Sequence, residues 1–139
     1  MKYSLQSGII DKKQLTDDIY MLHILCPEIA SLIIPGQFLH IRCGDKTLRR
    51  PISVCDCDDN SVKIVFKVKG YGTRYLSERK AGDILEIIGP LGNGFELSEY
   101  KKVLLVGGGI GIPPLLYLAR RKPGTSALLG FRNSDEIIL

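Results

Sequence analysis

The chain has 139 residues, of which 45% are hydrophobic and 24% are charged, and its formal net charge is +4. This composition predicts a globular protein with a hydrophobic core, and no apolar run reaches the roughly 20 residues that a membrane span requires. The basic residues are scattered or lie in short clusters without interleaved aromatic residues, so nucleic-acid binding is not expected.

The four cysteines do not have the spacing of a metal site. Cys55 and Cys57 are two positions apart, so on a strand both side chains would point to the same face. Structural zinc and iron–sulfur sites usually carry cysteine pairs of the form C-x₂₋₄-C, which this chain lacks. We therefore expect ordinary reduced thiols and no metal. The N-terminus has no uninterrupted apolar segment of the kind found in secretory signals, which favours the cytoplasm.

The first hundred residues are typical of short strands separated by polar turns. Turns are predicted at residues 11–14, 17–18, 35–37, 44–46, 56–60 and 81–83, and a loop at 27–34. The glycine- and proline-rich residues 89–95 are expected to close the structure. Strands at this regular spacing predict a compact antiparallel β-barrel. The predicted strands are 4–10, 19–25, 38–43, 48–54, 61–69 and 84–88.

Two of these strands differ in pattern. Residues 19–25 are mostly apolar on both faces, which fits a strand inside a closed barrel. Residues 61–69 alternate apolar and lysine-rich positions, which predicts one side facing water. His23 lies in the middle of the first strand without a serine, cysteine or carboxylate nearby, so we interpret it as a packed or edge histidine, not a catalytic one.

The stretch from Leu48 to Thr73 carries the clearest chemical signals, and they lie at its two ends. At the first end, Arg49 and Arg50 precede Pro51-Ile52-Ser53, and a guanidinium can bind a phosphate with a planar fork of donors. Proline cannot donate to a sheet ladder, so this segment is an edge, a bulge or a strand that turns toward a ligand. The alternative is an edge strand with two solvated arginines.

At the second end, Gly70-Tyr71-Gly72-Thr73 follows a strand. Glycines let the backbone approach a ligand closely, and a helix over 74–78, capped by Thr73, would direct free N–H groups at it. Leu76 would be the inward anchor of this helix. Two phosphate-binding ends folded beside each other suit the pyrophosphate of a flavin dinucleotide.

After residue 100 the pattern is that of an α/β domain. Residues 101–106 predict a buried strand, Gly107–Ile112 a glycine loop, 113–121 a helix opened by two prolines, and 126–131 a second, parallel strand. Ile112 stands where the G-x-G-x-x-G fingerprint needs glycine, so this loop alone is a weak dinucleotide signal. Residues 134–136 resemble a further helix start. Two parallel strands and one helix cannot bury both faces of a sheet, so we expect a truncated unit or one completed by a partner.

Taken together and in order, these motifs resemble the electron-transfer subunit of B-type dihydroorotate dehydrogenase, a member of the ferredoxin–NADP reductase superfamily. The resemblance covers essentially the whole chain. It implies an FAD-binding antiparallel β-barrel over residues 1–99, followed by the N-terminal part of a nicotinamide-nucleotide-binding α/β domain over 100–139. The motifs are Arg49-Arg50-Pro51-Ile52-Ser53, Gly72-Thr73 and the segments 89–95, 107–115 and 129–131.

The resemblance also implies roles for individual residues. Arg50 would hold a pyrophosphate oxygen, Ser53 would hydrogen-bond the flavin ring, and the glycine loop would lie where the nicotinamide approaches. No general acid or base is expected, because the flavin performs the hydride chemistry. The cofactor-binding residues so implied are Arg50, Pro51, Ile52, Ser53, Val65, Phe66, Lys67, Gly72, Thr73, Gly108, Gly109 and Gly111.

In this family NADH reduces FAD, and electrons pass singly through a [2Fe–2S] cluster to the FMN of a catalytic subunit within a heterotetramer that serves pyrimidine biosynthesis. Family members carry the cluster cysteines beyond the residues present here. We therefore expect FAD in this chain, leave NADH binding open, and expect the [2Fe–2S] cluster only in full-length relatives. The alternatives are the flavoprotein subunit of a ferredoxin-dependent NADP oxidoreductase or sulfide dehydrogenase, a non-catalytic FAD- or partner-binding fragment, and a flavin-free barrel. The doubled arginine favours the dihydroorotate member.

Overall fold

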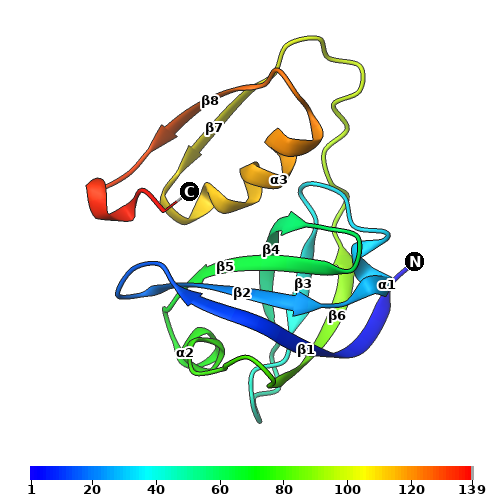
Figure 1. The fold of residues 1–139 in the computed structure, drawn as a ribbon, viewed down its shortest axis with the longest axis vertical. Coiled ribbons are helices and arrows are strands. Elements are labelled where there is room, and N and C mark those ends of the chain that lie inside the picture. The colour runs from blue at the N-terminus through cyan, green and yellow to red at the C-terminus, as the bar shows by residue number, and fades with distance from the viewer. Residues whose placement is uncertain (139) are drawn as a thin grey trace.

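The computed structural model describes residues 1–138, which form a closed barrel and a smaller α/β unit beside it (Figure 1). Six antiparallel strands close the barrel in the order β1-β2-β5-β4-β3-β6. The predicted fold class, an antiparallel β-barrel followed by the start of a parallel α/β unit, is confirmed. The barrel elements are β1 (Tyr3–Gln14), β2 (Ile19–Leu25), α1 (Pro27–Ala30), β3 (Phe38–Ile41), β4 (Arg50–Cys57), β5 (Ser61–Lys67), α2 (Tyr71–Ser77) and β6 (Ile84–Leu91).

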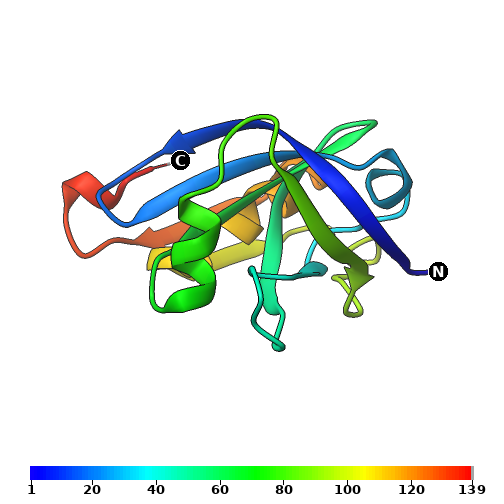
Figure 2. The same cartoon turned by 90° about the horizontal axis from the view of Figure 1, so that it is seen from below.

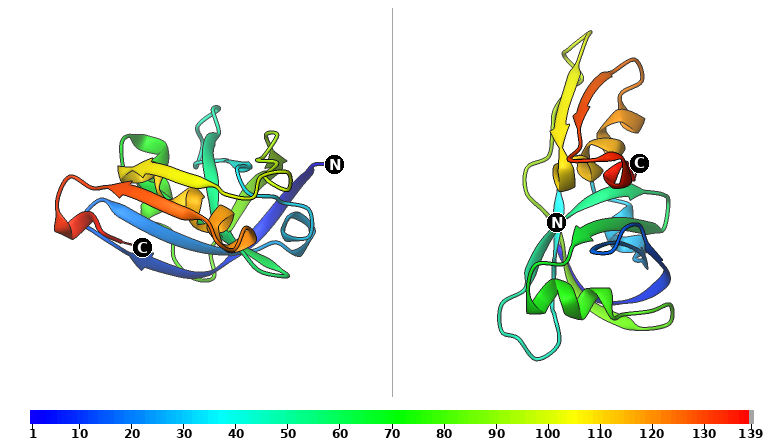
Figure 3. Two further views of the ribbon diagram at one scale, coloured as in Figure 1. Left: turned by 90° about the horizontal axis from the view of Figure 1, so that it is seen from above. Right: turned by 90° about the vertical axis from the view of Figure 1, so that its left-hand side faces the viewer.

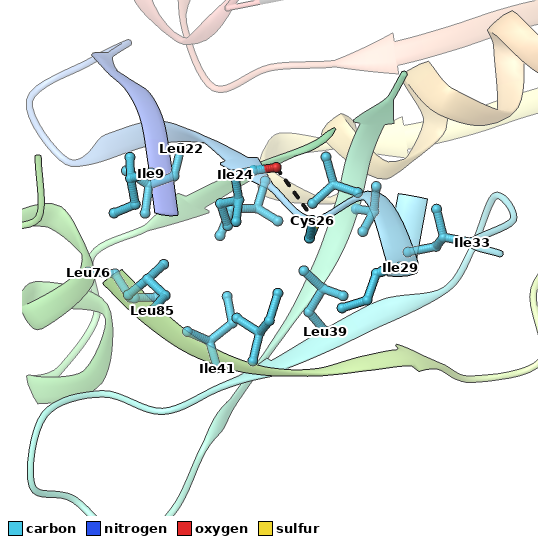
Figure 4. Packing of buried hydrophobic residues seen from close by; sticks show 14 of the residues in the cluster. Ile9, Leu22, Ile24, Cys26, Ile29, Ile33, Leu39, Ile41, Leu76 and Leu85 are labelled. Atoms are coloured by element: carbon cyan, nitrogen blue, oxygen red, sulfur yellow. Dashed lines mark hydrogen bonds between the residues drawn. The ribbon is translucent and has the colours of Figure 1, made fainter. Parts of the chain in front are cut away.

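The barrel interior is filled by aliphatic side chains from every strand (Figure 4). Leu22 and Ile24 point inward from β2 and are fully buried. The helix α2 lies at one end of the barrel (Figure 2) and sends Leu76 into the core beside Leu85. Burying one such side chain contributes about 1.5–3 kcal/mol. Leu76 is the inward anchor that the sequence predicted.

Several element boundaries differ from those predicted. Residues 11–14 are strand and not turn, because Asp11 to Gln14 pair with His23 to Tyr20 of β2. The turn is confined to residues 15–18, where the Thr16 hydroxyl accepts the N–H groups of Asp18 and Ile19. The predicted loop at 27–34 begins with the short helix α1, which opens at a proline. Polar residues can continue a strand when a partner strand forms hydrogen bonds with their backbone groups.

A β-bulge in β4 corrects the prediction for the cysteines. The register between β4 and β5 shifts between Val54 and Asp56. Cys55 therefore packs with an apolar cluster outside the barrel, while Cys57 packs against the barrel core. The two side chains do not share a face, because the extra residue of a bulge reverses the alternation that follows it.

The smaller unit consists of β7 (Leu104–Gly108), the 3₁₀ helix η1 (Gly109–Gly111), α3 (Pro113–Arg121), β8 (Ser126–Gly130) and the 3₁₀ helix η2 (Ser134–Glu136). The strands β7 and β8 are parallel, as predicted. The prediction of a buried first strand is correct for one face only, since Leu105 is 6% exposed whereas Leu104 is 61% and Val106 is 66% exposed. The helix α3 lies between this sheet and the barrel (Figures 1 and 3), so the opposite sheet face is left uncovered, as expected for two strands and one helix.

The helix α3 and the end of the chain cover one outer side of the barrel. Leu116 and Ile138 pack against Ile19, Cys55 and Val65. Val65 is consequently only 6% exposed. The predicted water-facing side of β5 is therefore largely covered, by residues that lie more than forty positions later in the chain. Within residues 1–138, no helix has both the length and the apolar character needed to cross a membrane.

Candidate functional site

The barrel wall parts between β4 and β5, and this opening forms a groove. Val54 pairs with Ile64, and the ladder continues to Cys57 opposite Val62. Before this ladder, the described residues of β4 pair with β3, and beyond it those of β5 pair with β2. Residues 50–53 and 65–67 thus face each other across a gap without joining in a ladder.

The groove has a volume of about 250 Å³. Pro51 lies in its wall, where the parted strands leave no β5 partner that would need the missing proline N–H. Residues 50–53 pair on one side only, with β3, so this part of β4 is locally an edge within a closed barrel and lines the groove, which agrees with both the edge and the ligand-facing prediction. The lining residues are Pro51, Ile52, Ser53, Val65, Phe66, Lys67, Lys69, Thr73, Ile110 and Pro114.

Arg50 and Gly72 meet beside this groove, which joins the two ends of the predicted site. A Cβ atom added to Gly72 would lie 2.6 Å from Nε and 2.7 Å from Cγ of Arg50. Such distances are shorter than van der Waals contact, so only glycine lets the arginine side chain pack on the first turn of α2. The glycine is thus required for the approach of Arg50, in addition to any approach of a ligand.

The two adjacent arginines have different surroundings. Arg49 forms an ion pair with Glu86 of β6 and donates a 3.2 Å hydrogen bond to the Glu86 carbonyl oxygen. The hydrogen bond from Arg49 is the main reason that the pKa of Glu86 lies below its usual value, and a second bond from Arg42 adds to it. Arg49 therefore supports the barrel wall, and Arg50 is the arginine that lies at Gly72.

The start of α2 differs from the prediction. The helix begins at Tyr71 with Gly70 as its N-cap residue, so Thr73 is the third helical residue and not the cap. Its Oγ1 atom accepts hydrogen bonds from the N–H groups of Lys69 (2.8 Å) and Gly70 (3.3 Å). The hydroxyl thereby fixes the turn from β5 into α2. Glycine is an accepted N-cap residue, and this was the signal that the sequence reading overlooked.

The three predicted glycines of the loop are divided between two elements. Gly108 ends β7, and Gly109 and Gly111 belong to η1. Gly109 lines a second groove of about 380 Å³, which shares Lys67, Lys69 and Ile110 with the first. Gly108 and Gly111 are sequence neighbours of the lining residues Gly109 and Ile110, but they line neither groove. The second groove is also lined by Ile19, Arg132, Glu136 and Ile138.

Three lining residues of the first groove, Lys69, Ile110 and Pro114, were not among the predicted site residues. Lys69 lies two positions after the predicted Lys67, and Pro114 belongs to the proline pair that opens the predicted helix, so both residues lay in segments that the sequence had located. Their convergence depends on how α3 docks. Lys67 itself lies 3.5 Å from Asp18 and 3.9 Å from Glu136, so carboxylates from both parts of the molecule face it.

His23 has polar neighbours that the sequence reading missed. Its Nε2 atom lies 2.6 Å from the Ser61 hydroxyl and 3.8 Å from the Asp58 carboxylate. The pairing of β2 with β5 brings them together. Hydrogen bonds from the Ser61 hydroxyl and from backbone N–H groups lower the pKa of Asp58. Ser61 is 1% exposed, so this network closes the β4–β5 turn and offers no accessible nucleophile.

The cysteines are free thiols and are held in their neutral form. Burial raises the pKa of Cys26 to about 12 and that of Cys55 to about 11. Nucleophilic attack and metal binding both require the thiolate. In the part of the chain that the structure describes, no three His, Cys, Asp or Glu side chains gather to hold a metal ion.

Comparison with known proteins gives two close sets of relatives. No family model matches the chain. Over 99% of its length it is 44% identical to the dihydroorotate dehydrogenase B (NAD(+)) electron transfer subunit of Caldanaerobacter subterraneus, and it covers 56% of that protein. The subunit of the same name from Streptococcus mutans is 41% identical over 94% of the chain, with 55% of the relative covered. The chain is homologous to these electron-transfer subunits.

The predicted resemblance is thereby confirmed, and the chain spans about half the length of the curated relatives it matches. Among solved structures, an NADH-dependent reduced ferredoxin-NADP oxidoreductase matches all of the chain and 53% of its own, with 36% identity and a TM-score of 0.87. Phthalate dioxygenase reductase matches 92% of the chain and 43% of its own, with 27% identity and a TM-score of 0.75. By their names, these homologues are electron-transfer subunits and these structural neighbours are an oxidoreductase and a reductase.

Proposed function

We propose that this chain is the FAD-binding part of the electron-transfer subunit of an NADH-linked dihydroorotate dehydrogenase. The observation that carries the proposal is the groove between the parted ends of β4 and β5. Seven of the residues that the family resemblance assigned to the cofactor line it, namely Pro51, Ile52, Ser53, Val65, Phe66, Lys67 and Thr73. Residues from distant parts of the sequence thus converge on one opening.

The residues present fit a flavin dinucleotide. Ile52 is half-buried and offers apolar surface for a planar ring, Val65 and Phe66 line the groove as buried residues, and Ser53 supplies a hydroxyl. Arg50 lies at Gly72, where the N–H groups in the first turn of α2 have no acceptor within the helix. Arg50 would hold a pyrophosphate oxygen there, since a guanidinium matches phosphate geometry. When bound, FAD supplies the ability to accept a hydride and release single electrons.

In this proposal, residues 1–99 are the FAD-binding barrel domain and residues 100–139 are the N-terminal part of the nicotinamide-nucleotide domain. The second groove, which Gly109 and Lys67 both line, supports an approach of NADH from the side of the glycine loop. The electrons would leave toward an FMN-containing catalytic subunit in the cytoplasm, within a heterotetramer. The [2Fe–2S] cluster of full-length relatives would lie outside the residues present here.

The absorption spectrum of the purified chain, before and after anaerobic addition of NADH, tests the proposal. A flavin band that NADH bleaches is the expected result for a chain that binds both FAD and NADH. A flavin band that persists would restrict the function to FAD binding. A chain that shows no flavin band, even after incubation with FAD, would contradict the proposal.

A second candidate has a specific observation in its favour. The oxidoreductase structure that matches the whole chain at 36% identity is an NADH-dependent reduced ferredoxin-NADP oxidoreductase. The chain could therefore be the corresponding part of a ferredoxin-linked flavoprotein. The higher identity to the dihydroorotate dehydrogenase subunit, 44%, favours the first candidate. Co-purification with either an FMN-containing dihydroorotate dehydrogenase subunit or a ferredoxin-dependent subunit distinguishes the two.

A further inference from the structure

The helix α3 is held against the barrel at three points on one face. Leu116 packs in the apolar cluster outside the barrel. The Tyr117 hydroxyl donates a buried 3.0 Å hydrogen bond to the carbonyl oxygen of Ile33. Arg120 Nη1 lies 2.8 Å from Oδ2 of Asp56. Residues three and four positions apart lie on one side of a helix, so all three contacts hold the same face.

The bulge in β4 determines that the Asp56 side chain points toward α3. Since the register shifts between Val54 and Asp56, the consecutive residues Cys55 and Asp56 both face α3. The Asp56 side chain is 8% exposed, and its Oδ1 atom accepts the N–H of Cys57 at 3.0 Å. A buried carboxylate that loses its counter-ion is strongly destabilising. The bulge and Arg120 thus form a specific anchor and not a chance surface pair.

The same helix supplies one wall of the groove. Ile110, in η1, and Pro114, in the first turn of α3, line the groove together with Ser53 and Phe66 of the barrel. The helix rises about 1.5 Å per residue and is stiff over two turns. The position of its C-terminal half at Arg120 therefore sets the position of the wall at Pro114. The contact between Arg50 and Gly72, by contrast, lies within the barrel and does not involve α3.

We propose that Asp56 is a positioning residue for the flavin half of the cofactor, because its ion pair with Arg120 holds α3 so that Ile110 and Pro114 close one side of the groove. This inference rests on the proposed function, since it assigns the groove to the flavin ring. According to this inference, the two halves of the cofactor site have different structural supports. The ring half depends on the docking of α3, and the phosphate half at Arg50 depends on the barrel alone.

Asp56→Asn removes the ion pair and keeps an oxygen that can accept the Cys57 N–H. We expect the Kd for FAD, measured by titration of the flavin absorbance, to rise about tenfold, which is about 1.4 kcal/mol. ADP can occupy only the phosphate half of the site. Its dissociation constant, measured by competition with FAD, should change less than about twofold. Asp59→Asn, an exposed carboxylate in the adjacent turn, is the matched control and should leave both constants unchanged.

Arg120 provides the second test, because its side chain is 62% exposed and its replacement carries little risk for folding. Arg120→Gln should reproduce the selective loss of FAD affinity, and Arg120→Lys, which keeps the charge, should restore most of it. In a double-mutant cycle, the variant that combines Asp56→Asn with Arg120→Gln should bind FAD with no lower affinity than the more weakly binding single variant. Equal losses for FAD and ADP, unchanged FAD affinity, or additive effects would each overturn the inference.

Hydrogen exchange separates this inference from the proposed function. Asp56→Asn should accelerate exchange at the amides of α3 and η1 but not at those of β2, whether or not a flavin is present. If the wild-type chain binds no FAD, the proposed function is wrong even if this exchange pattern is found. If the wild-type chain binds FAD and α3 exchanges equally in both proteins, the positioning role is wrong and the proposed function stands.

Discussion

The barrel and the smaller α/β unit bury their apolar residues in different ways. Leu22 and Ile24 are completely enclosed by the barrel's own strands, whereas every residue of β8 is exposed. In the smaller unit, Tyr117 is buried in contact with the barrel core cluster. The barrel thus has an internal core, while the smaller unit depends on the barrel for much of its burial. We therefore expect the barrel to determine most of the stability of the molecule and the smaller unit to be ordered by docking on it.

The largest expected effect comes from the barrel interior. Ile24→Ala should lower the free energy of unfolding by about 2–5 kcal/mol, because it leaves a cavity among fully buried side chains. Leu128→Ala on β8, where the side chain is 63% exposed, should change it by less than about 0.5 kcal/mol. Denaturant unfolding followed by circular dichroism measures both. Similar losses in the two variants would contradict the contrast between the two regions.

Gly72→Ala tests the phosphate end of the groove on the barrel. The added methyl group would collide with Arg50, so we expect the arginine to be displaced and the affinity for FAD to fall about tenfold, or about 1.4 kcal/mol. Gly70→Ala is the control, since an added Cβ there has nothing within 4 Å. Isothermal titration with FAD compares them. An unaltered affinity in Gly72→Ala would show that the Arg50 contact is not needed for binding.

Tyr117→Phe tests the docking of the smaller unit without altering the barrel. Loss of the hydrogen bond to the Ile33 carbonyl should cost about 1 kcal/mol. Because the bond joins α3 to the barrel, we expect faster hydrogen exchange in α3 and nearly unchanged exchange in β2. A uniform change across both regions would mean that the two parts unfold as one cooperative unit.

The smallest expected effect is a loss of folding stability at low pH that arises from Glu86 in the barrel wall. The pKa of Glu86 is lowered in the folded state, mainly by the hydrogen bond from Arg49. Its contribution is therefore complete above the usual glutamate pKa of 4.5 and is lost as the pH falls through the lowered folded value. Glu86→Gln should flatten the decline in melting temperature below this pH. An equally steep decline in Glu86→Gln would assign the acid sensitivity to other carboxylates.

The sequence predicted those features that depend on local pattern. A strand that is apolar on both faces located β2, alternating apolar residues located β5, the proline pair located the start of α3, and Arg50 and Ser53 were identified beside the groove. The bulge at Asp56 was not predictable, because it is a shift of register against another strand. The covering of Val65 by Leu116 likewise depends on tertiary docking. The ion pair that holds Arg49 was also beyond the sequence, since its partner Glu86 comes from β6.

The parting of β4 and β5 has a consequence for the entropy of binding. Each wall of the groove is held on its outer side by a complete ladder, residues 50–53 by β3 and residues 65–67 by β2. A ligand that enters between them finds the backbone already fixed, so little conformational freedom is lost when it binds. Affinity in such a preorganised opening is governed by the side chains that line it and not by the ordering of a loop.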